Sequence, residues 1–208
     1  KATVDVVHKN GGVFIADEVQ PGFARTGQAF FGFARHGIVP DMITMGKPMG
    51  NGIPISGLAA KEDVLAAFSD KLPYFNTFGG NPVSIAAAQA VLKYIKDENL
   101  QEHCKKAGAA LLKALKEVQE RHPESVGDVR GAGLFLGFEF VKNDGNKTPD
   151  KDMALNVIEM LRDEHILTSV IGHYGNILKL RPPMVFSEND IDWFATSLDK
   201  CITKLENK

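Results

Sequence analysis

Two short runs of apolar residues stand out in the hydrophobic pattern of the first quarter of the chain. The first run, Val13 to Ala16, follows a pair of glycines and ends in the acids Asp17 and Glu18. The second run, Met42 to Met45, ends two residues before Lys47. Apolar runs of this length, bounded by turn residues, predict strands, and we expect the first to be buried on both faces of its sheet. If the strands are parallel neighbours, an acid and an amine leave the sheet at one edge, where open α/β sheets bind ligands.

The rest of the pattern predicts helices and strands in succession. Residues 81–122 have helical spacing with an acidic break, which indicates two helices or one bent helix. Ser187 is followed three positions later by Asp190, which predicts a capped final helix. The glycines of residues 126–133 lack a phosphate-loop motif, so we expect a turn-rich stretch that permits close backbone packing. The other predicted elements are strands over 53–60, 134–141, 166–170 and 176–180, and helices over 61–68 and 151–164.

Composition narrows the class of protein. The 208 residues are 44% hydrophobic and 24% charged, as in a globular chain of one large or two small domains. A net charge of −2 gives no electrostatic reason to expect nucleic acid or an anionic membrane as a partner. No apolar run reaches the roughly 20 residues of a membrane helix. Cys104, Cys201 and the six scattered histidines have no metal-ligand spacing, so no metal site is predicted and the cysteines are expected to be reduced.

Asp17 and Lys47 together suit the chemistry of pyridoxal phosphate. The aldehyde of this cofactor needs a lysine imine, and its ring nitrogen needs a carboxylate partner. We expect both side chains to be buried and to face one crevice, where burial favours a neutral amine that can act as a base. Each residue also has an ordinary interpretation, since acids at strand ends often cap helices and lysines after glycines often lie in solvated loops.

Three ordered blocks make the chain resemble the class III (ω-amino) aminotransferases: FIADEVQPGFARTG at 14–27, PDMITMGK at 40–47 and FNTFGGNP at 75–82. The resemblance implies an α/β fold, that of the fold-type I PLP-dependent transferases. Residues 1–100 would be the C-terminal part of the large mixed-sheet domain that binds the cofactor. Residues 101–208 would form a linking helix and a small C-terminal α+β domain. The chain looks most similar to the alanine-glyoxylate type and to ethanolamine-phosphate phospholyase relatives.

The same resemblance implies roles for five residues. Asp17 would pair with the pyridine nitrogen, and Val19 would pack on the face of the ring. Gln20 would bond the ring hydroxyl, and Lys47 would attach the cofactor covalently and move protons. Thr77 would reach the cofactor phosphate of a second subunit, which implies a homodimer. From the residues alone, Thr77 is equally well read as an ordinary turn hydroxyl.

The stretch 21–37, rich in glycine and phenylalanine, leaves two interpretations open. One is a mobile loop, and the other is an aromatic floor around the cofactor or at a dimer contact. The resemblance favours the second.

Lys179 and Arg181 are the candidate substrate contacts. Many family members that use α-amino acids have an arginine at the position of Lys179, and its planar fork grips the substrate carboxylate. Lysine is a point charge and not a fork, so this departure puts the usual contact in doubt. Arg181 is expected on the same strand face. The alternative is that both cations serve a domain interface or the solvent.

Three hypotheses of function follow. The first is a PLP-dependent transaminase that moves an amino group from an amine or amino acid to an oxo-acid such as pyruvate or glyoxylate. The second is a phospholyase that eliminates phosphate from an amino-alcohol phosphate, which Lys179 would suit. The third is a noncatalytic fragment, because the chain resembles only the C-terminal half of such an enzyme and activity is expected to need the preceding half. A cytoplasmic location is expected, with a mitochondrial one as the alternative in a eukaryote.

Overall fold

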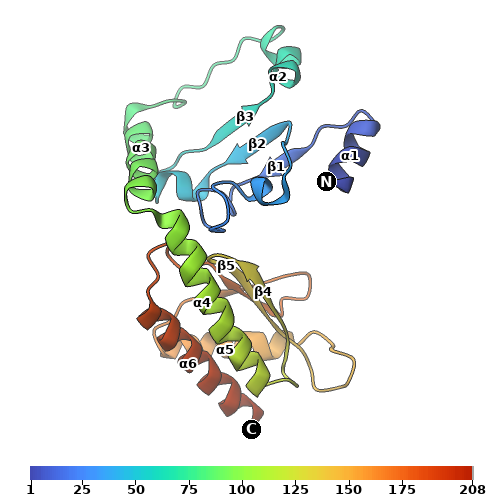
Figure 1. Ribbon diagram of the computed structural model, residues 1–208, viewed down its shortest axis with the longest axis vertical. Helices are drawn as coiled ribbons and strands as arrows, with labels where there is room; N and C mark the ends of the chain where they lie inside the picture. The colour runs from blue at the N-terminus through green and yellow to red at the C-terminus, as the bar shows by residue number, and fades with distance from the viewer. Residues whose placement is uncertain (208) are drawn as a thin grey trace. The chain divides into compact units, whose positions relative to one another are not determined.

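The computed structural model describes residues 1–207 and divides into two compact units, residues 1–101 and residues 102–208. Each unit contains a β-sheet of its own (Figure 1). The two units are described separately below.

The first unit is built on a three-stranded sheet in the order β1-β2-β3. β1 pairs in parallel with β2 and places Asp17 opposite Thr44, whereas β3 runs antiparallel to β2. The prediction that the two apolar runs form strands is therefore confirmed, and the condition that they be parallel neighbours is met. The elements are α1 (Ala2–Lys9), β1 (Ile15–Asp17), η1 (Gly32–His36), β2 (Met42–Met45), η2 (Lys47–Gly50), β3 (Gly57–Ala60), α2 (Glu62–Ser69) and α3 (Pro82–Asp97).

The expected burial of the first strand on both faces is wrong for the described residues. Ala16 is buried, but Ile15 beside it is 52% exposed and Asp17 is also exposed. Because side chains alternate along a strand, this pattern means that β1 is covered on one face only. A continuous apolar run is typical of a strand that is covered on both faces. Among the described residues, only one face of β1 is covered.

Asp41 anchors the end of the first sheet opposite to the strand exits. Its carboxylate pairs with His8 Nε2 at 2.7 Å and with Lys61 Nζ at 2.7 Å. It also accepts a hydrogen bond of 2.8 Å from the backbone N–H of Phe14, just before β1. The hydrogen bonds from Lys61, Phe14 and His8 hold the pKa of Asp41 far below its usual range. The hydrogen bond between Lys61 and Asp41 also raises the pKa of Lys61.

The Asp41 anchor predicts an acid-dependent loss of stability. Because the folded-state pKa of Asp41 is lowered, its contribution is present above the unfolded pKa of about 3.9 and is lost as the pH falls below that value. We expect Asp41→Asn to lower the free energy of unfolding at pH 7, and the difference from wild type to shrink toward pH 3. Urea unfolding across this range is the measurement, with the exposed acid at the end of α5, Asp163→Asn, as control. Parallel pH profiles for wild type and Asp41→Asn would contradict the assignment.

The second unit carries a four-stranded antiparallel sheet in the order β4-β5-β7-β6. Residues 126–132, predicted as a turn-rich stretch, form strand β4, because their pairing with β5 outweighs the low strand propensity of their glycines. The strand predicted to begin at 166 begins at Ser169, since the N–H of Ile166 still bonds Leu161 at the end of α5. The elements are α4 (Leu100–Arg121), β4 (Val126–Ala132), β5 (Phe135–Phe140), α5 (Lys151–Asp163), β6 (Ser169–Ile171), β7 (Ile177–Leu180) and α6 (Glu188–Glu206).

The helical predictions are largely confirmed. The stretch 81–122 forms two helices, α3 and α4, separated at Asn99, whose φ is 48°. Ser187 and Asp190 form the predicted capping box at the start of α6. Cys104 and Cys201 are both buried, with their sulfurs reduced as expected.

The core of the second unit lies on one face of its sheet. Along β5 the alternate side chains of Leu136, Phe138 and Phe140 are fully or almost fully buried. They belong to one apolar cluster with residues of α4, α5 and α6, so these helices cover the same face. The opposite face keeps half-buried residues, Lys179 of β7 among them. Lys179 therefore alternates with the core residues Leu178 and Leu180 and belongs to the face opposite to the apolar cluster.

Close backbone packing at the β4–β5 turn confirms the expectation for its glycines. A Cβ built on Gly108 of α4 would lie 2.3 Å from the carbonyl carbon of Gly133. No real side chain fits at that distance, so the helix can approach the turn only with glycine at this position.

Candidate functional site

The predicted cofactor residues of the first unit gather where β1 and β2 end. Asp17 is the last residue of β1, and Lys47 follows β2 after a single intervening residue. Asp17 Oδ1 accepts hydrogen bonds of 3.1 Å from the hydroxyl of Thr44 and from the N–H of Val19. The partner strand and the following turn thus hold the carboxylate in a defined orientation at the sheet edge.

Lys47 has an unusual backbone conformation. Its φ is 31°, in the left-handed region that residues with a Cβ rarely adopt, and it is the first residue of η2. The preceding Gly46 lies beside Val19, since a Cβ built on it would be 3.8 Å from Val19 Cγ1. Val19 is thereby packed next to the backbone that leads into Lys47. Strain of this kind is typical of functional sites, where surrounding structure maintains it.

The expectation of a buried acid and a buried amine is wrong for the described residues. Asp17 and Lys47 are both exposed, as is Gln20, while Val19 is half-buried. The physical reason is the same open face that leaves Ile15 exposed: the described part of the chain covers this edge of the sheet incompletely. Asp17, Val19, Gln20 and Lys47 thus lie at one edge of the sheet, but the described residues do not bury them.

The phenylalanine-rich segment after Gln20 is a packed structure. Phe30 and Phe31 lie edge to face with ring centroids 5.0 Å apart, and Phe33 stacks on Phe31 at 5.7 Å. Phe23 joins the same cluster at 5.5 Å from Phe30. These ring contacts order the segment directly beyond the turn that carries Val19 and Gln20, and the aromatic floor around the cofactor or at a dimer contact stays a prediction.

Glu18 is a residue of this edge that the sequence analysis did not single out. Its side chain turns away from solvent and is 2% exposed, and its carboxylate accepts hydrogen bonds from the N–H groups of Gly32 and Phe33, both at 2.7 Å. Its neighbour Asp17 was chosen because cofactor chemistry needs an acid there. The period-2 alternation of a strand could have indicated that the adjacent acid points to the opposite side, into the protein.

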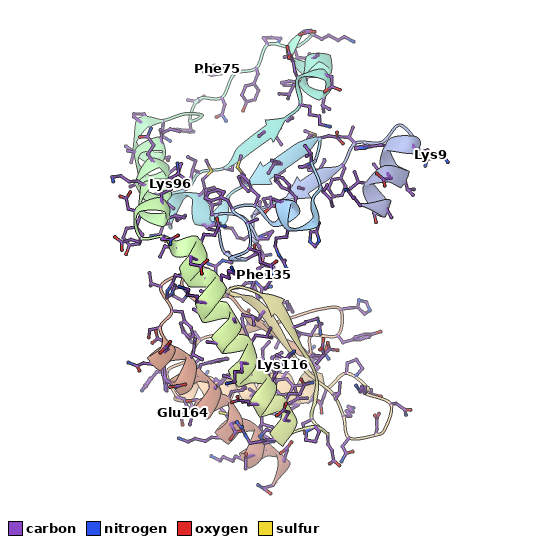
Figure 2. The ribbon with its side chains drawn as sticks, viewed as in Figure 1. Lys9, Phe75, Lys96, Lys116, Phe135 and Glu164 are labelled. Atoms are coloured by element: carbon purple, nitrogen blue, oxygen red, sulfur yellow. The ribbon has the colours of Figure 1, made fainter. Side chains whose placement is uncertain are left out.

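Thr77 lies on the extended segment between α2 and α3, and it is exposed. Figure 2 labels Phe75 on this segment, where its ring is 85% exposed. Asn76 Oδ1 accepts hydrogen bonds from the N–H of Phe78 at 3.2 Å and of Gly79 at 3.0 Å, which forms a turn around Thr77. The N-cap of α3 follows at Asn81, whose side chain accepts from Ser84 N–H at 3.0 Å.

A cavity of about 410 Å³ adjoins this turn. It is polar on one side, where glycine and asparagine residues precede α3, and it is closed on the other side by the segment before β3. Ser84 Oγ fixes the two sides together by donating to the carbonyl of Pro54 at 3.0 Å. The lining residues are Pro54, Ile55, Ser56, Asn76, Phe78, Gly79, Gly80, Asn81, Ser84 and Ile85.

Lys179 and Arg181 both belong to the second unit and line one cavity of about 430 Å³. Lys179 sits between Gly137 of β5 and Ser169 of β6 in the sheet register. A Cβ built on Gly137 would lie 3.1 Å from Ile177 Cγ2, so the Ile177 side chain fills the space beside the glycine. Lys179 is therefore held in the middle of the sheet and lines the cavity from β7.

Arg181 has a different environment. Its Nη1 donates to the carbonyl oxygens of Leu136 at 2.5 Å and Leu180 at 2.8 Å. Its guanidinium lies 3.3 Å from the centroid of the Phe135 ring, a cation–π contact. Arg181 follows the end of β7, and these contacts hold the ends of β5 and β7 together.

Residues 1–207 contain no group of three or more His, Cys, Asp or Glu side chains that could hold a metal ion. Within the same residues, no helix is both long enough and apolar enough to cross a membrane.

Comparison with known proteins identifies a family and several relatives. The family model described as Aminotransferase class-III matches residues 2–202. An ethanolamine-phosphate phospho-lyase homolog of Caenorhabditis elegans is 44% identical over 200 residues, which cover 95% of this chain and 43% of the relative. A mitochondrial alanine-glyoxylate aminotransferase 2 homolog of Arabidopsis thaliana is 41% identical over 204 residues, which cover 98% of this chain and 42% of the relative.

Solved structures give the same result. A phospholyase from Arthrobacter, in complex with phosphoethanolamine, superposes with a TM-score of 0.91 at 39% identity, over 96% of this chain and 47% of that one. An aminotransferase of Bacillus anthracis superposes with a TM-score of 0.89 at 36% identity, over 98% of this chain and 47% of that one. The chain thus spans less than half the length of these relatives.

Proposed function

Because the chain belongs to the class-III aminotransferase family, we propose that it carries the cofactor edge of a PLP-dependent enzyme that moves an amino group from an amine or amino acid to an oxo-acid. Pyruvate and glyoxylate are the proposed acceptors. The fold is the α/β fold of the fold-type I PLP-dependent transferases. One observation carries the proposal: the parallel pairing of β1 with β2 delivers Asp17 and Lys47 at the same edge of a sheet.

The residues present fit pyridoxal phosphate. Asp17 would accept a hydrogen bond from the protonated ring nitrogen, since Thr44 and Val19 already orient its carboxylate. The Val19 side chain would pack on the ring, Gln20 would bond the ring hydroxyl, and Lys47 would attach the cofactor at its aldehyde. These assignments match an acid, an apolar contact, a polar side chain and an amine to the four chemical features of the ring.

Thr77 is proposed to serve the cofactor of a second subunit. Its hydroxyl lies in a turn with glycine amides nearby, and hydroxyl and amide donors together suit a phosphate. The exposed aromatic rings on the same segment, with Phe75 and Phe78 both at least 80% exposed, would be covered by that subunit. We therefore propose a homodimer, in the cytoplasm or the mitochondrion.

In the proposed mechanism Lys47 is the group that moves protons. Bound pyridoxal phosphate supplies an electron sink for the pair of electrons left when the carbon bearing the amino group loses its proton. Lys47 Nζ takes that proton and returns it, so it must be unprotonated when it acts. Asp17 would hold a proton at the ring nitrogen by its negative charge, and Lys179 would offer a cation to the acid group of a substrate. The oxo-acid half of the reaction uses the same residues in reverse.

Lys47→Ala tests the central assignment. In the full-length protein supplied with pyridoxal phosphate, we expect this variant to lose the visible absorption of lysine-bound cofactor and at least about a hundredfold in kcat, since the proton-transfer group is gone. Lys71→Ala, an exposed lysine of the first unit, is the control and should match wild type. Unchanged absorbance in Lys47→Ala would show that another group attaches the cofactor, and absorbance missing from the wild type would favour the noncatalytic hypothesis.

Asp17→Asn separates charge from shape. The amide oxygen can still accept from Thr44 and Val19, so the strand end should stay in place. Loss of the negative charge should weaken protonation of the ring nitrogen and lower kcat by about a hundredfold or more while the cofactor remains bound. Steady-state kinetics with a parallel measurement of bound cofactor distinguishes the two effects. If Asp17→Asn has the kcat of the wild type, Asp17 does not have the proposed role.

A phospholyase is a second candidate function. Lys179 stands where many family members have arginine, and a compact ammonium suits a phosphate group as a point charge. The relatives named above include a phospho-lyase homolog and a phospholyase with phosphoethanolamine. In this reaction Lys47 would take the same carbon-bound proton, and the neighbouring C–O bond would break as phosphate leaves with the electron pair.

A substrate comparison decides between the two candidates. We expect the full-length protein to transfer the amino group of β-alanine or ornithine to pyruvate. We further expect Lys179→Ala to raise KM about tenfold with kcat little changed, because a binding charge is lost. Release of inorganic phosphate from phosphoethanolamine, without amino transfer, would replace the transaminase proposal with the phospholyase one. Arg121→Ala, a half-exposed cation of α4, is the control for a general charge effect.

A further inference from the structure

We propose that Glu18 is a positioning residue for the cofactor edge, acting through Asp17, Val19 and Gln20 and not by contact with a ligand. The inference rests on the proposed function, since it assigns a role to a residue that supports the proposed cofactor contacts. Glu18 stands between Asp17 and Val19 in sequence, but its side chain points to the buried side of the strand exit. It is therefore placed to control the turn without meeting the reacting atoms.

Each oxygen of the Glu18 carboxylate has its own backbone donor. Oε2 accepts from the N–H of Gly32 at 2.7 Å, and Oε1 accepts from the N–H of Phe33 at 2.7 Å. Hydrogen bonds to an ionised carboxylate are shorter and roughly twice as strong as neutral ones. With the side chain 2% exposed, these bonds compete little with water. The first residues of η1 are thus tied to the end of β1.

The backbone of Glu18 is held from both sides. Its N–H donates to the carbonyl of Thr44 at 3.0 Å, which extends the β1–β2 pairing beyond Asp17. Its carbonyl accepts from the N–H of Gly22 at 3.1 Å, which closes the turn around Val19 and Gln20. The partner strand, the turn and η1 therefore meet at this single residue.

Gly32 is required for the hydrogen bond that its N–H donates to Glu18. A Cβ at this position would lie 2.9 Å from Pro21 Cβ and 3.3 Å from Glu18 Oε1. The absence of a side chain is what allows the N–H of Gly32 to reach the carboxylate while Pro21 passes beside it. Gly32→Ala is consequently a second, independent way to displace the contact with the carboxylate itself unchanged.

The segment that Glu18 anchors contains strained backbone. Phe23 and Ala24 have φ values of 58° and 67°, in the left-handed region that residues with a Cβ rarely adopt. The bond from Ala24 N–H to the carbonyl of Phe30 and the aromatic cluster help to maintain this conformation. Release of the Glu18 anchor would let the segment relax, and the turn that carries Val19 and Gln20 would move with it.

The test compares three variants of the full-length protein. Glu18→Gln keeps the shape but replaces one acceptor with an NH₂ group that faces a backbone N–H. Gly32→Ala disturbs the same contact from the other side. Glu206→Gln is the matched control, because the Glu206 carboxylate also has one partner on each oxygen, Ser125 Oγ at 2.6 Å and His122 Nδ1 at 2.7 Å, in the second unit.

Four readouts are needed: the dissociation constant of pyridoxal phosphate by equilibrium dialysis, hydrogen exchange of residues 30–37, the midpoint of unfolding, and kcat and KM with one amine. We expect Glu18→Gln and Gly32→Ala to raise exchange in residues 30–37 and to weaken cofactor binding by about tenfold, the effect of losing one charge-assisted hydrogen bond. We expect kcat to fall in both, with KM for the amine little changed. Glu206→Gln should lower the unfolding midpoint and leave cofactor binding unchanged.

Three outcomes would overturn the inference in distinguishable ways. If Glu18→Gln raises exchange in residues 30–37 but binds cofactor as wild type does, Glu18 stabilises the fold and positions nothing. If Glu206→Gln weakens cofactor binding as much as Glu18→Gln does, the effect is one of general stability. If the wild type itself binds no pyridoxal phosphate, the proposed function fails and this inference fails with it.

Discussion

Parallel pairing of β1 with β2 sets Asp17 opposite Thr44, and the proposed chemistry of the first unit depends on this register. A shift of one residue would turn Asp17 to the buried side and Glu18 to the edge, because side chains alternate along a strand. The two acids could not exchange roles, since one is oriented for a ligand by Thr44 and the other is bonded to the backbone of η1. The pairing therefore decides which carboxylate serves the site and which serves the fold.

In the second unit, the same alternation of side chains separates residues that pack in the core from a residue that can contact a ligand. Leu178 and Leu180 of β7 point into the core beneath α4, α5 and α6, and Lys179 between them belongs to the opposite face of the sheet. Arg181, beyond the strand, is engaged by carbonyl oxygens and by the Phe135 ring. The two cations that the sequence analysis treated together thus have unequal surroundings, and Lys179 is the better candidate for an anionic group of a substrate.

Sequence reasoning succeeded where one local rule dominates. Short apolar runs predicted β1 and β2, and the serine–acid spacing predicted the cap of α6. It failed where tertiary pairing decides, as in β4, whose glycines indicated a turn. Sequence reasoning also predicted Asp17 and Lys47 to be buried, and both are exposed. The hydrophobicity of a strand does not indicate which helices or loops pack on its faces. Glu18 was missed because its role comes from Gly32 and Phe33, at positions that no sequence spacing connects to it.

The central claim is that this sheet edge holds pyridoxal phosphate and uses it to move an amino group. The most direct measurement is the visible absorption spectrum of the full-length protein with pyridoxal phosphate, recorded before and after an amine and then after pyruvate. We expect an absorption band of lysine-bound cofactor that disappears when the amine is added and returns when pyruvate is added. A spectrum identical to that of free cofactor throughout would contradict it.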